Sequence, residues 1–201
     1  YSAYQGVITS GLQLLDIAAI QDTYGSQNIT TRSGDTAYAL GQGLGVHGAN
    51  KTDGFLYTIW DGNGTDTINA SGFSDLQDIH GVYHGVEIDL REGHFSSIGL
   101  NGFGEFWGKD GGDVSVEDKG NVAIAYDVKI ENAIGTNQDD TIIGNKYNNI
   151  LEGGGGSDTL EGGLGEDTLS GDLGADILYG GNNDDTFFGF GDANGLSGDN
   201  I

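Results

Sequence analysis

The feature that most constrains this chain is a nine-residue repeat that runs without interruption from Gly135 to Ser197. Seven units follow one another, each opening on glycine: GTNQDDTII, GNKYNNILE, GGGGSDTLE, GGLGEDTLS, GDLGADILY, GGNNDDTFF and GFGDANGLS. The sixth position of every unit is Asp or Asn, and the eighth is always a large apolar residue. Such a unit buries its apolar face only by stacking on its neighbours. The alternative, a flexible linker rich in Gly and Asp, does not explain why all seven eighth positions are apolar.

The repeat predicts a parallel β-roll, in which six residues of each unit turn and three form a short strand. Glycine accepts positive φ and lets backbones approach closely in the turns, while the eighth side chain points inward. Two units make one coil, so units n and n+2 stack at the strand spacing of about 4.8 Å. This stacking places Asp140 over Asp158 over Asp176, and Asp167 over Asp185.

The stacked carboxylates predict a bound metal ion. Two such charges about 5 Å apart repel by roughly 1 kcal/mol in water, and by about 3 kcal/mol at an effective dielectric of 20. A hard cation between the turns replaces this repulsion with attraction, because both carboxylates then face a positive charge. Calcium accepts carboxylates and backbone carbonyls together. Magnesium requires a tighter octahedron, and zinc prefers nitrogen or sulfur ligands. Because one buried apolar side chain per unit contributes only roughly 2–3 kcal/mol, we expect metal binding to switch folding.

The composition limits the classes of partner that this chain can bind. The net charge of −24 excludes a nucleic-acid-binding surface and argues against binding to anionic membranes. No segment approaches the 18 apolar residues of a membrane-spanning helix. The chain has no Cys, so no disulfide stabilises it. An acidic, cysteine-free protein that depends on calcium suits export to a calcium-rich exterior.

The sequence ahead of the repeat predicts one helix followed by strands. LQLLDIAAIQDTY (12–24) has the spacing of an amphipathic helix, and strand patterns occur at 55–60, 86–90 and 121–130. The segment Asp61–Asp66 is similar to a degenerate repeat; 109–113 is a weaker relative that a plain turn explains equally well. The expected fold is all-β, a parallel β-roll continuous with a β-sandwich and preceded by one α-helix. The expected divisions are a terminal segment with the helix (1–25), the sandwich (26–134) and the roll (135–201).

Several blocks outside the repeats carry a resemblance to a known family. They are LLDIAAIQDTYG (14–25), TTRSGDTAY (30–38), IWDGNGTDTINASGFS (59–74), DLREGHFSSIG (89–99) and GNVAIAYDVKIENAIG (120–135). With the nonapeptides, these blocks resemble the serralysin-type secreted zinc metalloproteases, whereas the repeats alone resemble only the wider class of calcium-binding RTX proteins. The resemblance implies that the helix closes a protease domain and that the rest is its calcium-binding C-terminal domain. It also implies secretion by a type I machinery and stabilisation of the attached protease outside the cell.

The catalytic motif of that family, HExxHxxGxxH, is absent. None of the four histidines, His47, His80, His84 and His94, is followed by Glu, and there is no Met for the family's Met-turn. His80 and His84 have the spacing of a helical zinc pair, but Gly81 and the lack of a helical pattern favour a surface loop. Zinc is therefore expected only in a parent protease. Two alternatives stay open: an RTX adhesion or surface module without protease, and a carbohydrate-active protein with an RTX appendage.

The resemblance also implies a set of calcium ligands. Ahead of the repeats these are Arg32, Gly34, Asp61, Asn63, Gly64, Asp66, Lys129 and Glu131. In the first two units they are Thr136, Gln138, Asp140, Asn145, Tyr147 and Asn149. In the later units they are Gly153, Gly154, Gly155, Gly156, Asp158, Gly162, Gly163, Leu164, Gly165, Asp167, Gly171, Asp172, Leu173, Gly174, Asp176, Asp185 and Asn194. Asn149 and Asn194 replace Asp, so weaker binding is expected where they contribute. Gln138 and Tyr147 replace the glycine of position four, so their turns are expected to be distorted.

Overall fold

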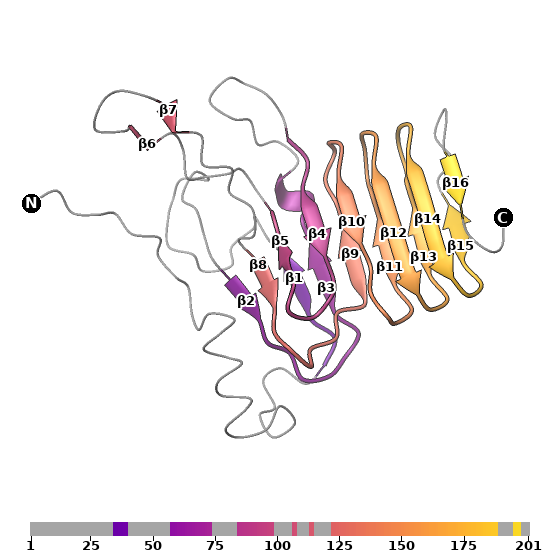
Figure 1. Cartoon of the computed structure of the whole chain (residues 1–201), viewed down its shortest axis with the longest axis horizontal. Coiled ribbons are helices and arrows are strands. Elements are labelled where there is room, and N and C mark those ends of the chain that lie inside the picture. The colour runs from indigo at the N-terminus through magenta and orange to yellow at the C-terminus, as the bar shows by residue number, and fades with distance from the viewer. Residues whose placement is uncertain are drawn as a thin grey trace, which may run out of the picture.

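The computed structural model describes residues 34–39, 57–73, 84–98, 106–107, 113–114, 122–188 and 195–197. The helix expected at 12–24 lies outside these residues. Within them the structure is almost entirely β, with one short 3-10 helix, η2 (Ser71–Phe73). No helix in this part of the chain is long and apolar enough to cross a membrane. Of the predicted fold class, the all-β character and the parallel β-roll are confirmed (Figure 1).

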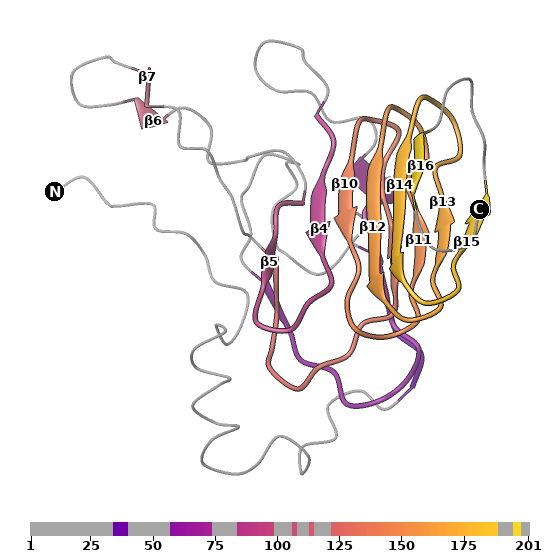
Figure 2. The ribbon, with the colours of Figure 1, turned by 45° about the vertical axis from the view of Figure 1, so that its right-hand side comes forward.

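Two parallel sheets form the roll and face each other (Figure 2). The six-stranded sheet has the order β1 (Ala37–Ala39), β3 (Thr67–Asn69), β9 (Asn132–Ile134), β11 (Ile150–Glu152), β13 (Thr168–Ser170), β15 (Thr186–Phe188). The five-stranded sheet has the order β16 (Gly195–Ser197), β14 (Ile177–Asn182), β12 (Thr159–Leu164), β10 (Thr141–Ile143), β4 (Glu87–Asp89). Consecutive units of the repeat alternate between the sheets, which confirms that two units make one coil. Four strands, β1, β3, β4 and β9, come from the sequence before the first unit.

The core of the roll consists of two columns of inward side chains. In the six-stranded sheet the registers align Tyr38, Ile68, Ala133, Leu151 and Leu169. In the other sheet they align Ile88, Ile142, Leu160 and Leu178. All nine side chains are at most 1% exposed. The eighth position of the repeat therefore points inward, as the pattern predicts, and the first coil continues the same core with residues from outside the repeat.

A three-stranded sheet lies beside the upstream coils. It consists of β2 (Tyr57–Ile59), parallel to β8 (Val122–Ile124), which pairs antiparallel with β5 (Phe95–Ser96). Ile59, Val122 and Ile124 are buried in the same hydrophobic cluster as the roll. A separate antiparallel pair joins β6 (Phe106–Trp107) and β7 (Asp113–Val114). The strands predicted at 55–60, 86–90 and 121–130 each contain an observed strand, but the second of them, β4, belongs to the roll.

Candidate calcium-binding turns

The sixth-position side chains stand directly before the strands and stack along each sheet. Beside the five-stranded sheet, Asp158 Oδ1 accepts the backbone N–H of Asp140 at 2.8 Å, and Asp176 Oδ1 accepts that of Asp158 at 3.0 Å. The three carboxylates are at most 2% exposed. The predicted stacking is thus confirmed. The carboxylates of Asp158 and Asp176 each hydrogen-bond to the turn one coil upstream.

A second column runs beside the six-stranded sheet and begins before the repeat. Asp185 Oδ1 accepts the N–H of Asp167 at 2.9 Å, and Asp167 Oδ1 accepts that of Asn149 at 2.8 Å. Further upstream, Glu131 Oε2 accepts the N–H of Asp66 at 2.7 Å. Asp66 and Glu131 precede β3 and β9 as the sixth-position residues precede their strands. Asp66 thereby occupies the sixth position of a degenerate repeat, in agreement with the similarity seen in the sequence of Asp61–Asp66.

The downstream carboxylates keep one oxygen without a donor. Oδ2 of Asp158, Asp167 and Asp185 is buried and accepts no hydrogen bond. A Cβ added to the first glycine of each unit, Gly153, Gly162 or Gly180, would collide with that oxygen. Each turn therefore folds its carboxylate back onto a glycine. A buried charged oxygen without a partner is strongly unfavourable. A cation bound at these oxygens would remove that penalty.

Backbone carbonyls are the candidates for the other ligands of such a cation. Within the described segments, no group of three or more His, Asp or Glu side chains is placed to hold a metal ion. Stacked turns do bring carbonyls close: a Cβ on Gly156 would lie 2.7 Å from the carbonyl oxygen of Gln138, and one on Gly163 would lie 2.5 Å from that of Asn145. Buried carboxylates with clustered carbonyls fit calcium, which takes six to eight oxygen ligands, better than zinc.

Positive φ angles mark the turns of the later units. At position four, Gly156, Gly165 and Gly174 have φ of 115°, 118° and 135°. At the same position of the sixth unit, Asn183 adopts 81° without being glycine. Gln138 and Tyr147 are not among the described residues with positive φ. The backbone at position four of these two turns therefore differs from that of the later turns, in the direction expected from the missing glycine.

The structure also places several of the predicted ligands from before the repeat close to one another. A Cβ on Gly64 would lie 2.6 Å from the carbonyl carbon of Gly34, so these two turns are in contact. One oxygen of Asp61 accepts the hydroxyl of Tyr38, and the other accepts the N–H of Gly62 at 2.6 Å. Lys129 Nζ lies 2.9 Å from Glu131 Oε1. Of the predicted set, Arg32 and Asn194 lie outside the described residues.

The fifth position, which the repeat pattern leaves open, contributes contacts that the sequence analysis missed. Asp139 Oδ1 accepts the N–H of Ser157 at 2.7 Å, and Asn148 Oδ1 accepts that of Glu166 at 3.1 Å. Both bonds join an upstream turn to the turn stacked on it. The only signal in the sequence is a short acceptor, Asp or Asn, at position five of the first two units.

Burial changes the acidity of the stacked carboxyls. It raises the pKa of Asp158 to about 7; the hydrogen bond from Asp140 opposes the shift, and the charges of Asp140 and Asp176 add to it. Burial likewise raises the pKa of Asp167 to about 6, against the hydrogen bond from Asn149. Desolvation also raises the pKa of Asp140. Without a cation, the carboxyl of Asp158 therefore becomes protonated near pH 7 and that of Asp167 near pH 6.

We expect the metal-free and the calcium-bound chain to respond to pH in opposite directions. The unfolded carboxyls titrate near pH 3.9, so between about pH 4 and 7 the folded form binds more protons and its stability falls as pH rises. Lowering the pH from 7 to 5 should increase the β signal of the calcium-stripped chain in circular dichroism, and should raise the calcium concentration needed for half-saturation. A stripped chain that loses β signal over this range would contradict the expectation.

Comparisons with known proteins agree with the geometry. A family model described as peptidase M10 serralysin C terminal matches residues 27–104. A second, described as RTX calcium-binding nonapeptide repeat, matches residues 134–169 and 170–200. The second match covers the turns of the nonapeptides with the stacked carboxylates, and the first covers β1, β3 and β4 of the upstream coils.

Individual relatives show how much of a longer protein is represented. The chain is 40% identical over 143 residues to serralysin B of Dickeya chrysanthemi, which covers 70% of this chain and 24% of the relative. It is 38% identical over 139 residues to metallopeptidase AprA of Pseudomonas marginalis, covering 68% and 24%. It is 37% identical over 145 residues to serralysin of Proteus mirabilis, covering 71% and 24%. The aligned part spans about a quarter of the length of these relatives.

Proposed function

Since the chain belongs to the serralysin family and comprises its C-terminal calcium-binding region, we propose that it is a calcium-gated folding module that stabilises an attached zinc metalloprotease domain outside the cell. In calcium-poor surroundings the stacked carboxylates repel one another and keep the roll open. In calcium-rich surroundings the cations bridge successive turns, and the roll closes. Transit through a type I secretion machinery in the open state follows from the same gating.

The observation that carries the proposal is the set of buried carboxylate oxygens without donors on Asp158, Asp167 and Asp185. Each lies in a turn whose glycines bring the carbonyls of the stacked turn within contact range. We assign the sixth-position carboxylates as side-chain ligands and the residues at positions one to four as carbonyl ligands. The set at Gly34, Asp61 and Asp66 provides a further site where the chain enters the roll.

The free energy of calcium binding is large enough to determine whether the roll is folded. A site exposed to calcium at ten times its Kd stabilises the fold by roughly 1.4 kcal/mol. About five such sites would contribute about 7 kcal/mol, which is comparable to the whole stability of an ordinary domain. A folded module of this kind tethers and shields the domain attached to it. The peptide-bond hydrolysis itself belongs to the zinc domain, for which these residues hold no catalytic motif.

The test is a far-UV circular dichroism titration that starts from chelated protein. We expect a cooperative transition from coil to β structure between micromolar and millimolar calcium. Magnesium at the same concentrations should produce no transition, because its octahedral preference does not fit turns built from carbonyls. If the chelated chain is already fully β, and calcium changes neither its spectrum nor its melting temperature, the gating proposal is wrong.

A further inference from the structure

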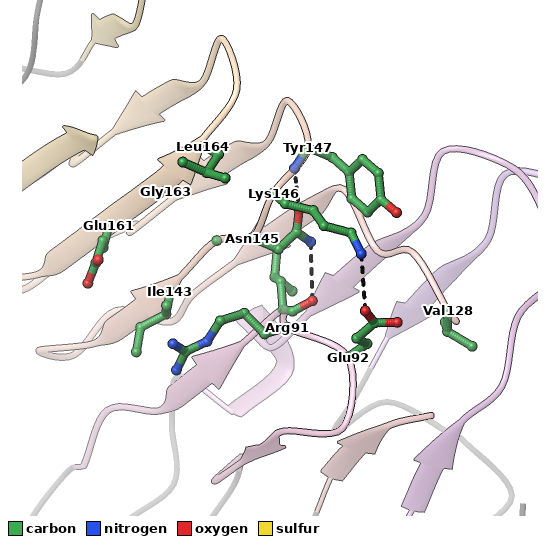
Figure 3. A pocket seen from close by; sticks show the side chains of 12 residues that line it. Arg91, Glu92, Val128, Ile143, Asn145, Lys146, Tyr147, Glu161, Gly163 and Leu164 are labelled. Atoms are coloured by element: carbon green, nitrogen blue, oxygen red, sulfur yellow. Dashed lines mark hydrogen bonds and ion pairs between the residues drawn. The ribbon is translucent and has the colours of Figure 1, made fainter. Parts of the chain in front are cut away.

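The asparagines of the described segments differ in how their amides are held. Asn145 in the second turn is fixed: Nδ2 donates to the carbonyls of Ile130 at 2.7 Å and Leu90 at 3.1 Å, and Oδ1 accepts the N–H of Tyr147 at 2.9 Å. Figure 3 shows this amide at the pocket between the second turn and the Arg91–Glu92 segment. An amide held in this way does not turn toward its own backbone.

Asn63 is exposed, and it is the one asparagine in the described segments that a glycine, Gly64, follows. In an Asn-Gly pair the backbone nitrogen of the glycine attacks the side-chain amide carbon easily, because the glycine has no side chain to hinder the approach. Asparagine is thermolabile in proteins, and this arrangement is the least hindered one. Asn63 is therefore the position in this part of the chain where spontaneous deamidation is chemically easiest.

The folded backbone around Gly64 opposes that reaction. A Cβ placed on Gly64 would lie 2.6 Å from the carbonyl carbon of Gly34, so one side of Gly64 is closed by a neighbouring turn. The next residue is also fixed, since Thr65 donates its N–H to Asp35 Oδ1 at 2.9 Å. Ring closure requires the peptide unit between Asn63 and Gly64 to rotate, and both contacts resist this rotation.

The same turns build the entrance site, the calcium site assigned above to Gly34, Asp61 and Asp66. Asn63 lies between its two carboxylates in the sequence, and these are 5% and 1% exposed. Buried like charges disfavour the ionised forms, so without calcium the turns of Gly34 and Gly64 are free to separate. Calcium holds the two turns together and thereby keeps the Gly64 nitrogen away from the Asn63 amide.

We propose that Asn63 is a deamidation site that calcium protects, so that its conversion records the time the chain has spent without calcium. The Gly64 nitrogen loses its proton and bonds to Cγ of Asn63, and the side-chain nitrogen leaves as ammonia. Water then opens the cyclic imide. Attack at the side-chain carbonyl gives aspartate, and attack at the backbone carbonyl gives isoaspartate. This inference rests on the proposed calcium gating and adds a chemical consequence to it.

The two products act on the entrance site in opposite directions. Aspartate adds a carboxylate two residues from Asp61, and additional carboxylates favour calcium. Isoaspartate lengthens the backbone by one methylene directly before Gly64. Gly64 then cannot keep its contact with Gly34 while Thr65 keeps its bond to Asp35. The isoaspartate form should therefore bind calcium more weakly at the entrance site.

Ageing the whole chain at mildly alkaline pH, in chelator and in calcium, tests the protection. Peptide mapping by mass spectrometry follows Asn63 and, as the internal control, Asn145. Calcium at ten times its Kd lowers the open population about tenfold, so Asn63 should convert at least about tenfold more slowly. Asn145, which a lysine follows, should stay largely intact in both solutions.

Circular dichroism of the same samples separates the possible failures. Equal conversion of Asn63 with and without calcium, while calcium still drives the transition from coil to β structure, overturns the protected site and leaves the gating standing. Equal conversion with an unchanged spectrum overturns both. Conversion of Asn145 as fast as Asn63 in chelator overturns the assignment of Asn63 as the specific site.

Asn63→Gln tests whether the damage passes through this residue, because glutamine needs a larger ring and should barely convert. The isoaspartate form of the parent chain, separated by chromatography after ageing in chelator, should need about two- to tenfold more calcium for half-saturation, as expected for the loss of one hydrogen bond. Fresh and aged Asn63→Gln should have equal midpoints. If aged Asn63→Gln loses calcium affinity as the parent chain does, the proposal is wrong.

Discussion

Replacing Asp158 with Asn should weaken calcium binding and, at the same time, make the metal-free roll easier to fold. The substitution keeps Oδ1, which accepts the N–H of Asp140 at 2.8 Å. It converts the buried Oδ2, which has no donor, into an amide nitrogen that cannot bind a cation. We expect the half-saturating calcium concentration to rise at least about tenfold, which corresponds to a loss of about 1.4 kcal/mol.

The effect in chelator has the opposite sign because the charge itself is unfavourable there. Burial raises the pKa of Asp158 to about 7, and Asp140 and Asp176 add repulsion. A neutral amide avoids this penalty, so metal-free stability at pH 7.5 should increase by about 1 kcal/mol. At pH 5 the carboxyl is already protonated in the folded chain, and the advantage of the amide should shrink.

Urea unfolding of Asp158→Asn in calcium and in chelator measures both effects. Glu152→Gln is the matched control, because it removes one negative charge from an exposed position of β11. Its calcium midpoint should stay within about twofold of the parent chain, as surface charges contribute little. If Asp158→Asn and Glu152→Gln behave alike, Asp158 is not a calcium ligand.

The repeat made the regular part of the roll predictable. Its glycines, sixth-position acids and eighth-position apolar residues each have one structural role. The structure of one coil therefore predicts the structure of the other regular coils. Leu160 lies opposite Ile142 and Leu178, and Asp158 stacks between Asp140 and Asp176, as the period of two units requires. The stacked carboxylates follow from this register alone, which is why the sequence predicts calcium without further structural information.

The upstream coil was less predictable because its pairing is long-range. Glu87 of β4 lies opposite Thr141 of β10, and Asp66 donates its N–H to Glu131, 65 residues away. VEIDL (86–90) reads as a strand, but nothing in its composition tells which sheet it joins. Similarly, the satisfied carboxyl of Asp140 depends on the Thr136 hydroxyl and the Val86 N–H. The repeat pattern treats Asp140 and Asp158 as equivalent, whereas the structure distinguishes them.

Gly156→Ala should be among the most damaging single substitutions in the turns, while Gly155→Ala next to it should be tolerated. Gly156 has φ of 115°, and an added Cβ would lie 2.5 Å from the carbonyl carbon of Gln138 and 2.7 Å from the N of Asp139. An L-residue loses about 1–2 kcal/mol in left-handed backbone, and overpacking against backbone adds about 1–3 kcal/mol. We therefore expect a loss of about 2–4 kcal/mol in saturating calcium.

Gly155 provides the control within the same turn. Its added Cβ would meet nothing nearer than 3.6 Å, and its φ is not in the left-handed region. Alanine there also restricts the unfolded chain, so stability should change by no more than about 0.5 kcal/mol, in the stabilising direction if at all.

Thermal unfolding at saturating and at limiting calcium compares the two variants. Gly156→Ala should also raise the calcium midpoint, because the displaced Gln138 backbone carries a carbonyl ligand of the proposed site. Equal stability of the two variants would mean that stacked turns are looser than the structure shows, and that their carbonyls are not held at fixed positions for a cation.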